Sequence, residues 1–108
     1  MHLPSEIFGN VIVVHTPEEL GGDQAFKLEP YLTSLERIQV VLDLDNTEML
    51  DSSGLTALLD SQESLRALRG DVKIAATNPM NRKILEVTRI DQQLEVFESV
   101  LDAVRSFQ

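Results

Sequence analysis

The sequence predicts an α/β domain in which helices cover a mixed β-sheet, with the order β-β-α-β-α-β-α-β-α. Short runs rich in β-branched residues alternate with longer segments whose apolar residues recur at helical spacing. Strands that alternate with helices in this way imply a largely parallel or mixed sheet. The length of 108 residues, without internal repeats or linkers, predicts one domain over residues 1–108.

The first strands are predicted by β-branched and apolar runs. Residues 11–14 read Val-Ile-Val-Val and predict a buried strand. Ile7 and Phe8 precede a Gly-Asn pair that suits a tight primed turn, so they are expected to pair with that strand as a hairpin. Residues 38–44 are almost continuously apolar, which is typical of a strand covered on both faces.

The first helix is expected after two glycines, with Asp23 as its N-cap. Pro30 lies inside the helical pattern and should kink the helix or begin a new turn. The apolar residues at helical spacing in this segment are Ala25, Leu28, Leu32 and Leu35.

The second helix is predicted over residues 51–69, and Gly70 is expected to end it. Its polar residues, such as Asp60 and Glu63, point away from its apolar side. That apolar side is formed by Leu55, Leu58, Leu59, Leu65 and Leu68.

The C-terminal part predicts a strand over residues 72–76, a short helix over 81–88, a weak strand near 94–97 and a terminal helix over 99–107. Asn-Pro at positions 78–79 closes the first of these strands. The side chains expected to be buried by the two helices are Ile84, Leu85, Val87, Val100, Leu101 and Val104.

The composition excludes several classes of function. Eighteen acidic and nine basic side chains give a net charge of −9, which disfavours nucleic acid and anionic membrane surfaces. This charge fits a partner with a basic face, and it equally fits a role in solubility alone. The absence of cysteine excludes thiol catalysis and cysteine metal sites. The first residues do not resemble a signal peptide and no apolar run approaches the ~20 residues of a membrane span, so a cytoplasmic location is expected.

The segment Asp51-Ser52-Ser53-Gly54 is the main candidate site, because it lies between a predicted strand and a predicted helix. In one interpretation, the aspartate and serines only cap the helix, which is worth ~1 kcal/mol. In the other, a serine at the helix start carries a phosphate, which the free backbone N–H groups and the helix dipole favour. A glycine in the first turn weakens a helix, but it leaves the neighbouring hydroxyl open to a modifying enzyme.

Other polar residues give weaker signals. Asp43 and Asp45 follow the central strand, as in phosphate-accepting or Mg²⁺-binding clusters, but the first strand ends in His-Thr rather than in acids. They are therefore expected to be exposed acids at the edge of the sheet. His2 and His15 are too few to predict a metal site or a Ser–His pair, and no phosphate-binding glycine motif occurs. We expect no cofactor, no metal and no catalytic activity.

Residues 41–55 resemble the core signature of STAS domains, and within them the anti-sigma factor antagonists. The shared features are a strand that ends in Asp-Leu, a short loop, a hydrophobic pair, and Asp-Ser-Ser-Gly at the start of the next helix. The similarity extends over nearly the whole chain, and it implies a STAS-type mixed sheet with helices.

The resemblance implies that Ser52 is phosphorylated by a partner anti-sigma factor with serine kinase activity, with Ser53 as second choice. It also implies that Asp51, Ser52, Ser53, Gly54 and Asp23 contact this partner. The unphosphorylated protein would bind the anti-sigma factor and free the sigma factor, and a PP2C-type phosphatase would reset the switch. Family members often carry an aspartate at the position of Gly21, so this chain departs from the pattern there.

Two alternatives remain open from the sequence. One is a STAS subunit of a lipid or anion ABC-type transport assembly, in which Ser52 is a contact residue. The other is an acyl-carrier-like protein, which is also small and acidic and has Asp-Ser at a helix start. Acyl carriers are helical bundles, so the predicted strands argue against the second alternative.

Overall fold

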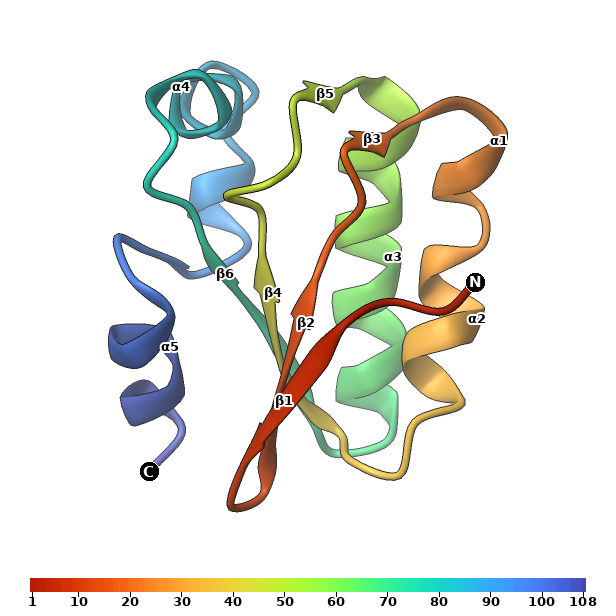
Figure 1. The fold of residues 1–108 in the computed structure, drawn as a ribbon, viewed down its shortest axis with the longest axis vertical. Coiled ribbons are helices and arrows are strands. Elements are labelled where there is room, and N and C mark those ends of the chain that lie inside the picture. Colours follow the sequence, from red (N-terminus) through yellow and green to blue (C-terminus); the bar gives the residue numbers. More distant parts are fainter.

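A computed structural model describes all residues, 1–108, and contains a five-stranded sheet with helices on both faces (Figure 1). In spatial order the strands are β1 (Ser5–Phe8), β2 (Val11–His15), β4 (Gln39–Asp43), β6 (Asp71–Ala75) and β7 (Val96–Phe97). β1 pairs with β2 in antiparallel orientation, and the other neighbours are parallel. The predicted α/β class with a mixed sheet is confirmed, and the acyl-carrier alternative is wrong because a helical bundle has no such sheet.

The remaining elements surround this sheet. A separate parallel pair, β3 (Glu19–Leu20) and β5 (Met49–Leu50), was not predicted from the sequence. A 3₁₀ turn at Ile90–Gln92 was not predicted either. The helices are α1 (Gly22–Ala25), α2 (Leu28–Thr33), α3 (Ser52–Ala67), α4 (Pro79–Val87) and α5 (Val100–Ser106). No helix has both the length and the apolar character needed to cross a membrane.

The N-terminal hairpin forms as predicted. Phe8 pairs with Val11, so Gly9 and Asn10 form a two-residue turn. Gly9 has a φ of 62°, and Asn10 has a negative φ, which is the pattern of a primed turn with glycine in first position.

The segment expected to form the first helix, after Asp23, instead forms two short helices, α1 and α2. Pro30 is the third residue of α2, where its missing N–H has no intrahelical partner to lose, so it begins a new turn rather than kinking a helix. Asp23 is not the N-cap: that position belongs to Gly21, and Asp23 lies exposed in the first turn of α1. The physical reason is that the Gly22 N–H donates to the carboxylate of Asp51 at 3.0 Å, so the cap comes from another segment.

The end of α3 also differs from the prediction. Arg69, rather than Gly70, has the left-handed conformation that ends the helix, with a φ of 70°. Gly70 donates to the carbonyl of Leu65 at 2.8 Å, as in a Schellman motif. A Cβ on Gly70 would lie 1.9 Å from the carbonyl oxygen of Ile38, so close packing is what requires glycine there. Leu68, predicted to be buried, is half exposed because it already belongs to this cap.

The two C-terminal helices begin at polar caps. Asn78 accepts a hydrogen bond from the Met80 N–H at the start of α4, and Ser99 accepts one from the Asp102 N–H at the start of α5. Val87 and Leu101, predicted to be buried, are exposed because they lie on the outer faces of these helices. Their neighbours on the inner faces, Leu85 and Val104, form the buried contacts instead. These two assignments are therefore corrected.

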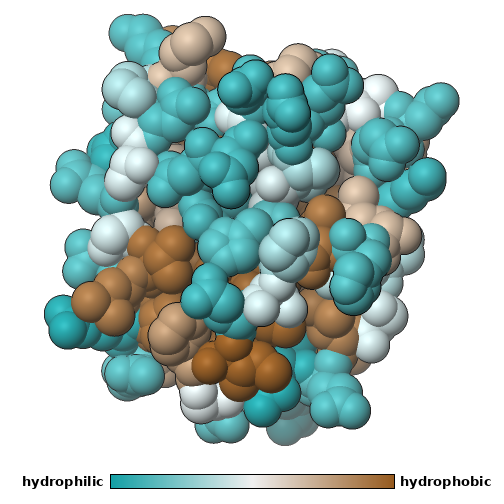
Figure 2. Space-filling view, viewed as in Figure 1, coloured by the Kyte–Doolittle hydropathy of each residue, from teal (hydrophilic) through white to brown (hydrophobic).

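The sheet separates two apolar cores. The larger core packs one face of the sheet against α1, α2, α3 and α4, and the smaller packs the other face against α5. The face of the molecule shown in Figure 2 is mostly hydrophilic in its upper half, and hydrophobic residues gather in its lower half.

Candidate functional site

Ser52 and Ser53 are the first two residues of the 16-residue helix α3. Ser52 is exposed and Ser53 is half-buried. The N–H groups of a first helical turn have no intrahelical partner, and the dipole of a long helix places partial positive charge there. Both hydroxyls therefore lie where a negative charge is stabilised, and the exposed one is open to a second molecule.

Asp51 connects this position to a second helix. One of its carboxylate oxygens accepts the Gly54 N–H of α3 at 2.9 Å, and the other accepts the Gly22 N–H of α1 at 3.0 Å. The hydrogen bond from Gly54 lowers the pKa of Asp51 below its usual value of 3.8, although partial desolvation opposes this effect and the Gly22 N–H adds to it. Asp51 is thus a fixed negative charge beside the serines at neutral pH.

Glycines at two positions make this arrangement possible. A Cβ on Gly54 would lie 2.1 Å from the carbonyl oxygen of Leu20, so glycine lets α3 approach β3 closely. This differs from the expected role of Gly54 in opening access to a hydroxyl, because Gly54 is buried and faces inward. A Cβ on Gly21 would lie 2.5 Å from the carboxyl carbon of Asp51, so the space of that side chain is taken by the Asp51 carboxylate.

The serines border a groove of about 530 Å³ between α3 and the α1–α2 segment. The predicted residue Asp23 does not line this groove, and its side chain makes no hydrogen bond in the structure. The lining residues from α3 are Ser52, Ser53, Thr56, Ala57, Asp60, Glu63 and Ser64, and those from α1–α2 are Ala25, Phe26 and Glu29.

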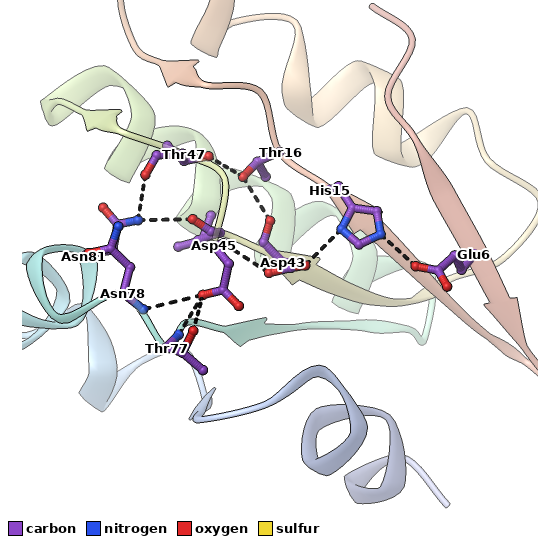
Figure 3. Close-up of polar contacts among 10 residues, drawn as sticks. Glu6, His15, Thr16, Asp43, Asp45, Thr47, Thr77, Asn78 and Asn81 are labelled. Atoms are coloured by element: carbon purple, nitrogen blue, oxygen red, sulfur yellow. Dashed lines mark hydrogen bonds and ion pairs between the residues drawn. The ribbon is translucent and has the colours of Figure 1, made fainter.

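A polar network lies at the carboxyl ends of the parallel strands (Figure 3). The two ring nitrogens of His15 contact Asp43 at 2.8 Å and Glu6 at 2.7 Å. Asp43 also accepts the Asp45 N–H at 3.0 Å and is buried, so the expectation that it is an exposed acid is wrong. Asp45 is exposed as expected, and it accepts the Thr77 N–H at 2.7 Å.

The network extends to the chain that leads into the candidate site. Asn81 on α4 is buried and donates to the carbonyls of Leu44 at 3.0 Å and Thr47 at 2.8 Å. The hydroxyls of Thr16 and Thr47 bond each other, and Thr47 also donates to Pro17. No buried side-chain polar atom is left without a partner, which is typical of a structural network rather than a reactive centre.

Sequence reasoning missed Asn81 and both threonines. The available signal was their position just after predicted strands or at a helix start, where polar side chains of parallel sheets converge. Arg82 and Lys83 line a smaller hollow of about 370 Å³. That hollow has mixed charge, since it is also lined by two glutamates, one of which pairs with Arg82 at 3.3 Å.

Comparison with known proteins matches this architecture. The family model of the STAS domain matches residues 2–103, whereas no curated protein matches the sequence. An anti-sigma factor antagonist from Mycobacterium paratuberculosis superposes with a TM-score of 0.83 at 25% identity, over 97% of this chain and 92% of that chain.

Two further solved structures share the fold at lower identity. A sulfate transporter family protein from Wolinella succinogenes gives a TM-score of 0.80 at 17% identity, over 94% of this chain and 87% of that chain. The Bacillus cell fate determinant SpoIIAA in its phosphorylated form gives a TM-score of 0.70 at 14% identity, over 99% of this chain and 100% of that chain. The same fold thus occurs both in an anti-sigma factor antagonist and in a sulfate transporter family protein.

Proposed function

This chain belongs to the STAS domain family, and from that premise we propose that it acts as an anti-sigma factor antagonist. In this proposal residues 1–108 form one regulatory domain that catalyses no reaction itself. Its partner is an anti-sigma factor with serine kinase activity in the bacterial cytoplasm. Phosphorylation of Ser52 releases that partner, a PP2C-type phosphatase removes the phosphate, and the cycle controls transcription through the sigma factor.

The observation that carries the proposal is the exposed hydroxyl of Ser52 at the start of α3, on the rim of a groove. Its surroundings suit phosphorylation, because the positive end of the α3 dipole stabilises an added anion. Ser53 borders the same groove but is half-buried, so Ser52 remains the first choice and Ser53 the second.

The charges beside Ser52 explain how phosphorylation would release a partner. A phosphoryl group adds roughly −1.5 to −2 charges. Asp51 is adjacent and ionised, and a kinase must bring the phosphates of its nucleotide to the same hydroxyl. Phosphoserine would therefore face negative charge from both sides once the complex excludes water, while the free protein tolerates it at the helix end.

Affinity measurements with Ser52 variants test this mechanism. Ser52→Ala should bind the anti-sigma factor within about threefold of the wild type, whereas Ser52→Asp should bind at least about tenfold more weakly, a loss of ~1.4 kcal/mol. Isothermal titration calorimetry gives both values. Ser5→Asp is the matched control, because it adds the same charge on the outer edge strand β1. Equal affinities for Ser52→Ala and Ser52→Asp would contradict the charge switch.

A phosphorylation assay separates this function from its alternative. Incubation with the anti-sigma factor and ATP should add ~80 Da to the peptide that contains Ser52, and Ser52→Ala should remove the added mass. A STAS subunit of a lipid or anion transport assembly remains the second candidate, because the fold is shared with a sulfate transporter family protein. In that case the serine is a contact residue, and no phosphoryl group is transferred to it.

A further inference from the structure

The groove beside α3 is lined by negative charges only, and the proposed switch at Ser52 does not involve them. Its three charged lining residues, Glu29, Asp60 and Glu63, are all acidic, and no lysine or arginine lines it. None of the three carboxylates takes part in the ion pairs of the protein, which use other acids. Asp60 and Glu63 are exposed, so their charges are available to a second molecule.

The two ends of the groove differ in chemistry. Ser52 lies at the start of α3, and Asp60 lies eight residues later, which corresponds to about 12 Å along a helix axis. The α3 side chains between them that line the groove are small or short, such as Ser53, Thr56 and Ala57, and this leaves the groove hollow. The groove thus has a hydroxyl end at the positive helix terminus and an anionic end two turns away.

The opposite wall supplies an apolar contact. Phe26 lies at the break between α1 and α2, and the residue is 74% exposed although it lines the groove. Exposed aromatic rings contact aliphatic chains and stack with cationic groups. An exposed ring that lines the same groove as three unpaired carboxylates suits a lysine or arginine side chain, whose aliphatic stem and charged end need both kinds of contact.

We infer that this groove docks a cationic segment of the partner protein, with lysine or arginine side chains on Asp60, Glu63 and Glu29 and an aliphatic stem on Phe26. The inference rests on the proposed function, since the partner is the kinase that acts on Ser52. A second copy of this chain does not fit, because it carries the same net charge of −9. Docking at the anionic end leaves the hydroxyl about 12 Å away free for phosphoryl transfer.

A peptide titration tests the docking directly. The probe is a synthetic amphipathic peptide of lysine, leucine and alanine, about 14 residues long, and its counterpart carries glutamate in place of lysine. Titration of the ¹⁵N-labelled protein with the lysine peptide should shift amide signals of residues 25–29 and 52–64, and the shifts should weaken with salt. The glutamate peptide should cause no shifts.

Paired variants give the decisive comparison. D60N/E63Q should bind the lysine peptide at least about tenfold more weakly than the wild type does. E36Q/D91N removes the same charge from exposed acids outside the groove and should change the affinity by less than about twofold. F26A should also lower the affinity for the lysine peptide. Thermal unfolding of each variant confirms that it is folded.

The outcomes separate this inference from the proposed function. Failure of the lysine peptide to bind, shifts outside the groove, or equal weakening by D60N/E63Q and E36Q/D91N would overturn the docking site. Retained affinity of D60N/E63Q for the anti-sigma factor, together with loss of affinity in Ser52→Asp, would overturn the docking site and leave the switch intact. The opposite pattern would support the docking site and contradict the switch.

Discussion

At the scale of single residues, Asp51 has a role that its position in sequence only half reveals. A capping aspartate was predictable for α3, and the hydrogen bond to Gly54 matches that prediction. Its second bond, to Gly22, was not predictable, because the two residues are 29 positions apart. The pKa of Asp51 is lowered in the folded state, so its contribution to stability is present above pH 3.8 and is lost as the pH falls through the lowered value.

Gly54 gives a prediction at the same scale. In Gly54→Ala the added methyl group would meet the carbonyl oxygen of Leu20 at 2.1 Å, so α3 must move away from β3. Overpacking of this kind costs about 1–3 kcal/mol. Urea unfolding measures the loss, and Thr56→Ala on the exposed face of α3 serves as a control that should stay within about 0.5 kcal/mol of the wild type. A Gly54→Ala variant as stable as the wild type would contradict the close packing.

His15 gives a prediction of pH dependence. Desolvation of the ring lowers its pKa, but the hydrogen bonds to Glu6 and Asp43 outweigh this and raise the pKa above its usual 6.5. The resulting stability is fully present below pH 6.5 and is lost as the pH rises through the raised value. Between about pH 6 and about pH 9, the free energy of unfolding should therefore fall more in the wild type than in His15→Gln. If the free energy of unfolding, measured with urea, changed with pH equally in the wild type and in His15→Gln, His15 would not be the group responsible.

At the scale of elements, the strands were the most predictable part of the molecule. The β-branched run in β2 and the apolar run in β4 carry their signal locally, and both form where the sequence predicts them. The ladder between β3 and β5 could not be predicted, because two-residue strands have no periodicity and their pairing joins residues 30 positions apart. The break between α1 and α2 was hidden by apolar spacing that continues across it.

The loop between β4 and β5 depends on Asn81. Asn81→Ala would leave the buried carbonyls of Leu44 and Thr47 without this donor, which costs about 1–3 kcal/mol. Amide hydrogen exchange should accelerate across residues 44–50, and urea unfolding should report the loss of stability. Asn46→Ala is the control, because Asn46 is exposed in the same loop. Unchanged exchange in Asn81→Ala would contradict the role of this side chain in fixing the loop.

At the scale of the whole molecule, the two faces of the sheet differ in what packs against them. The face covered by α1, α2 and α3 carries the groove and both serines. On the other face, Lys73 is buried beneath α5, where its ammonium group donates to the Ser106 hydroxyl at 2.9 Å and lies 4.3 Å from the Phe107 ring. These contacts of the buried lysine stabilise the packing of the C-terminal helix on the sheet. No sequence signal distinguished this lysine from the exposed basic residues.

The candidate site was predictable in outline and not in depth. The Asp-Ser-Ser-Gly segment identifies the start of a helix and a reachable hydroxyl from local sequence alone. The groove required the placement of α1 and α2 against α3, which depends on contacts among residues that are distant in sequence. For this reason the inferred roles of Glu29 and Phe26 come from the structure alone.

The short ladder between β3 and β5 has a consequence for tolerance to insertions. Leu20 pairs with the inward-facing Leu50, and each is followed at once by a glycine or aspartate of the shared helix cap. One extra residue inside β5, between Met49 and Leu50, would turn Leu50 outward and move Asp51 away from both helices. The spacing between β5 and Asp51 is therefore coupled to two helix starts, and lengthening it by one residue should disorganise α1 and α3 together.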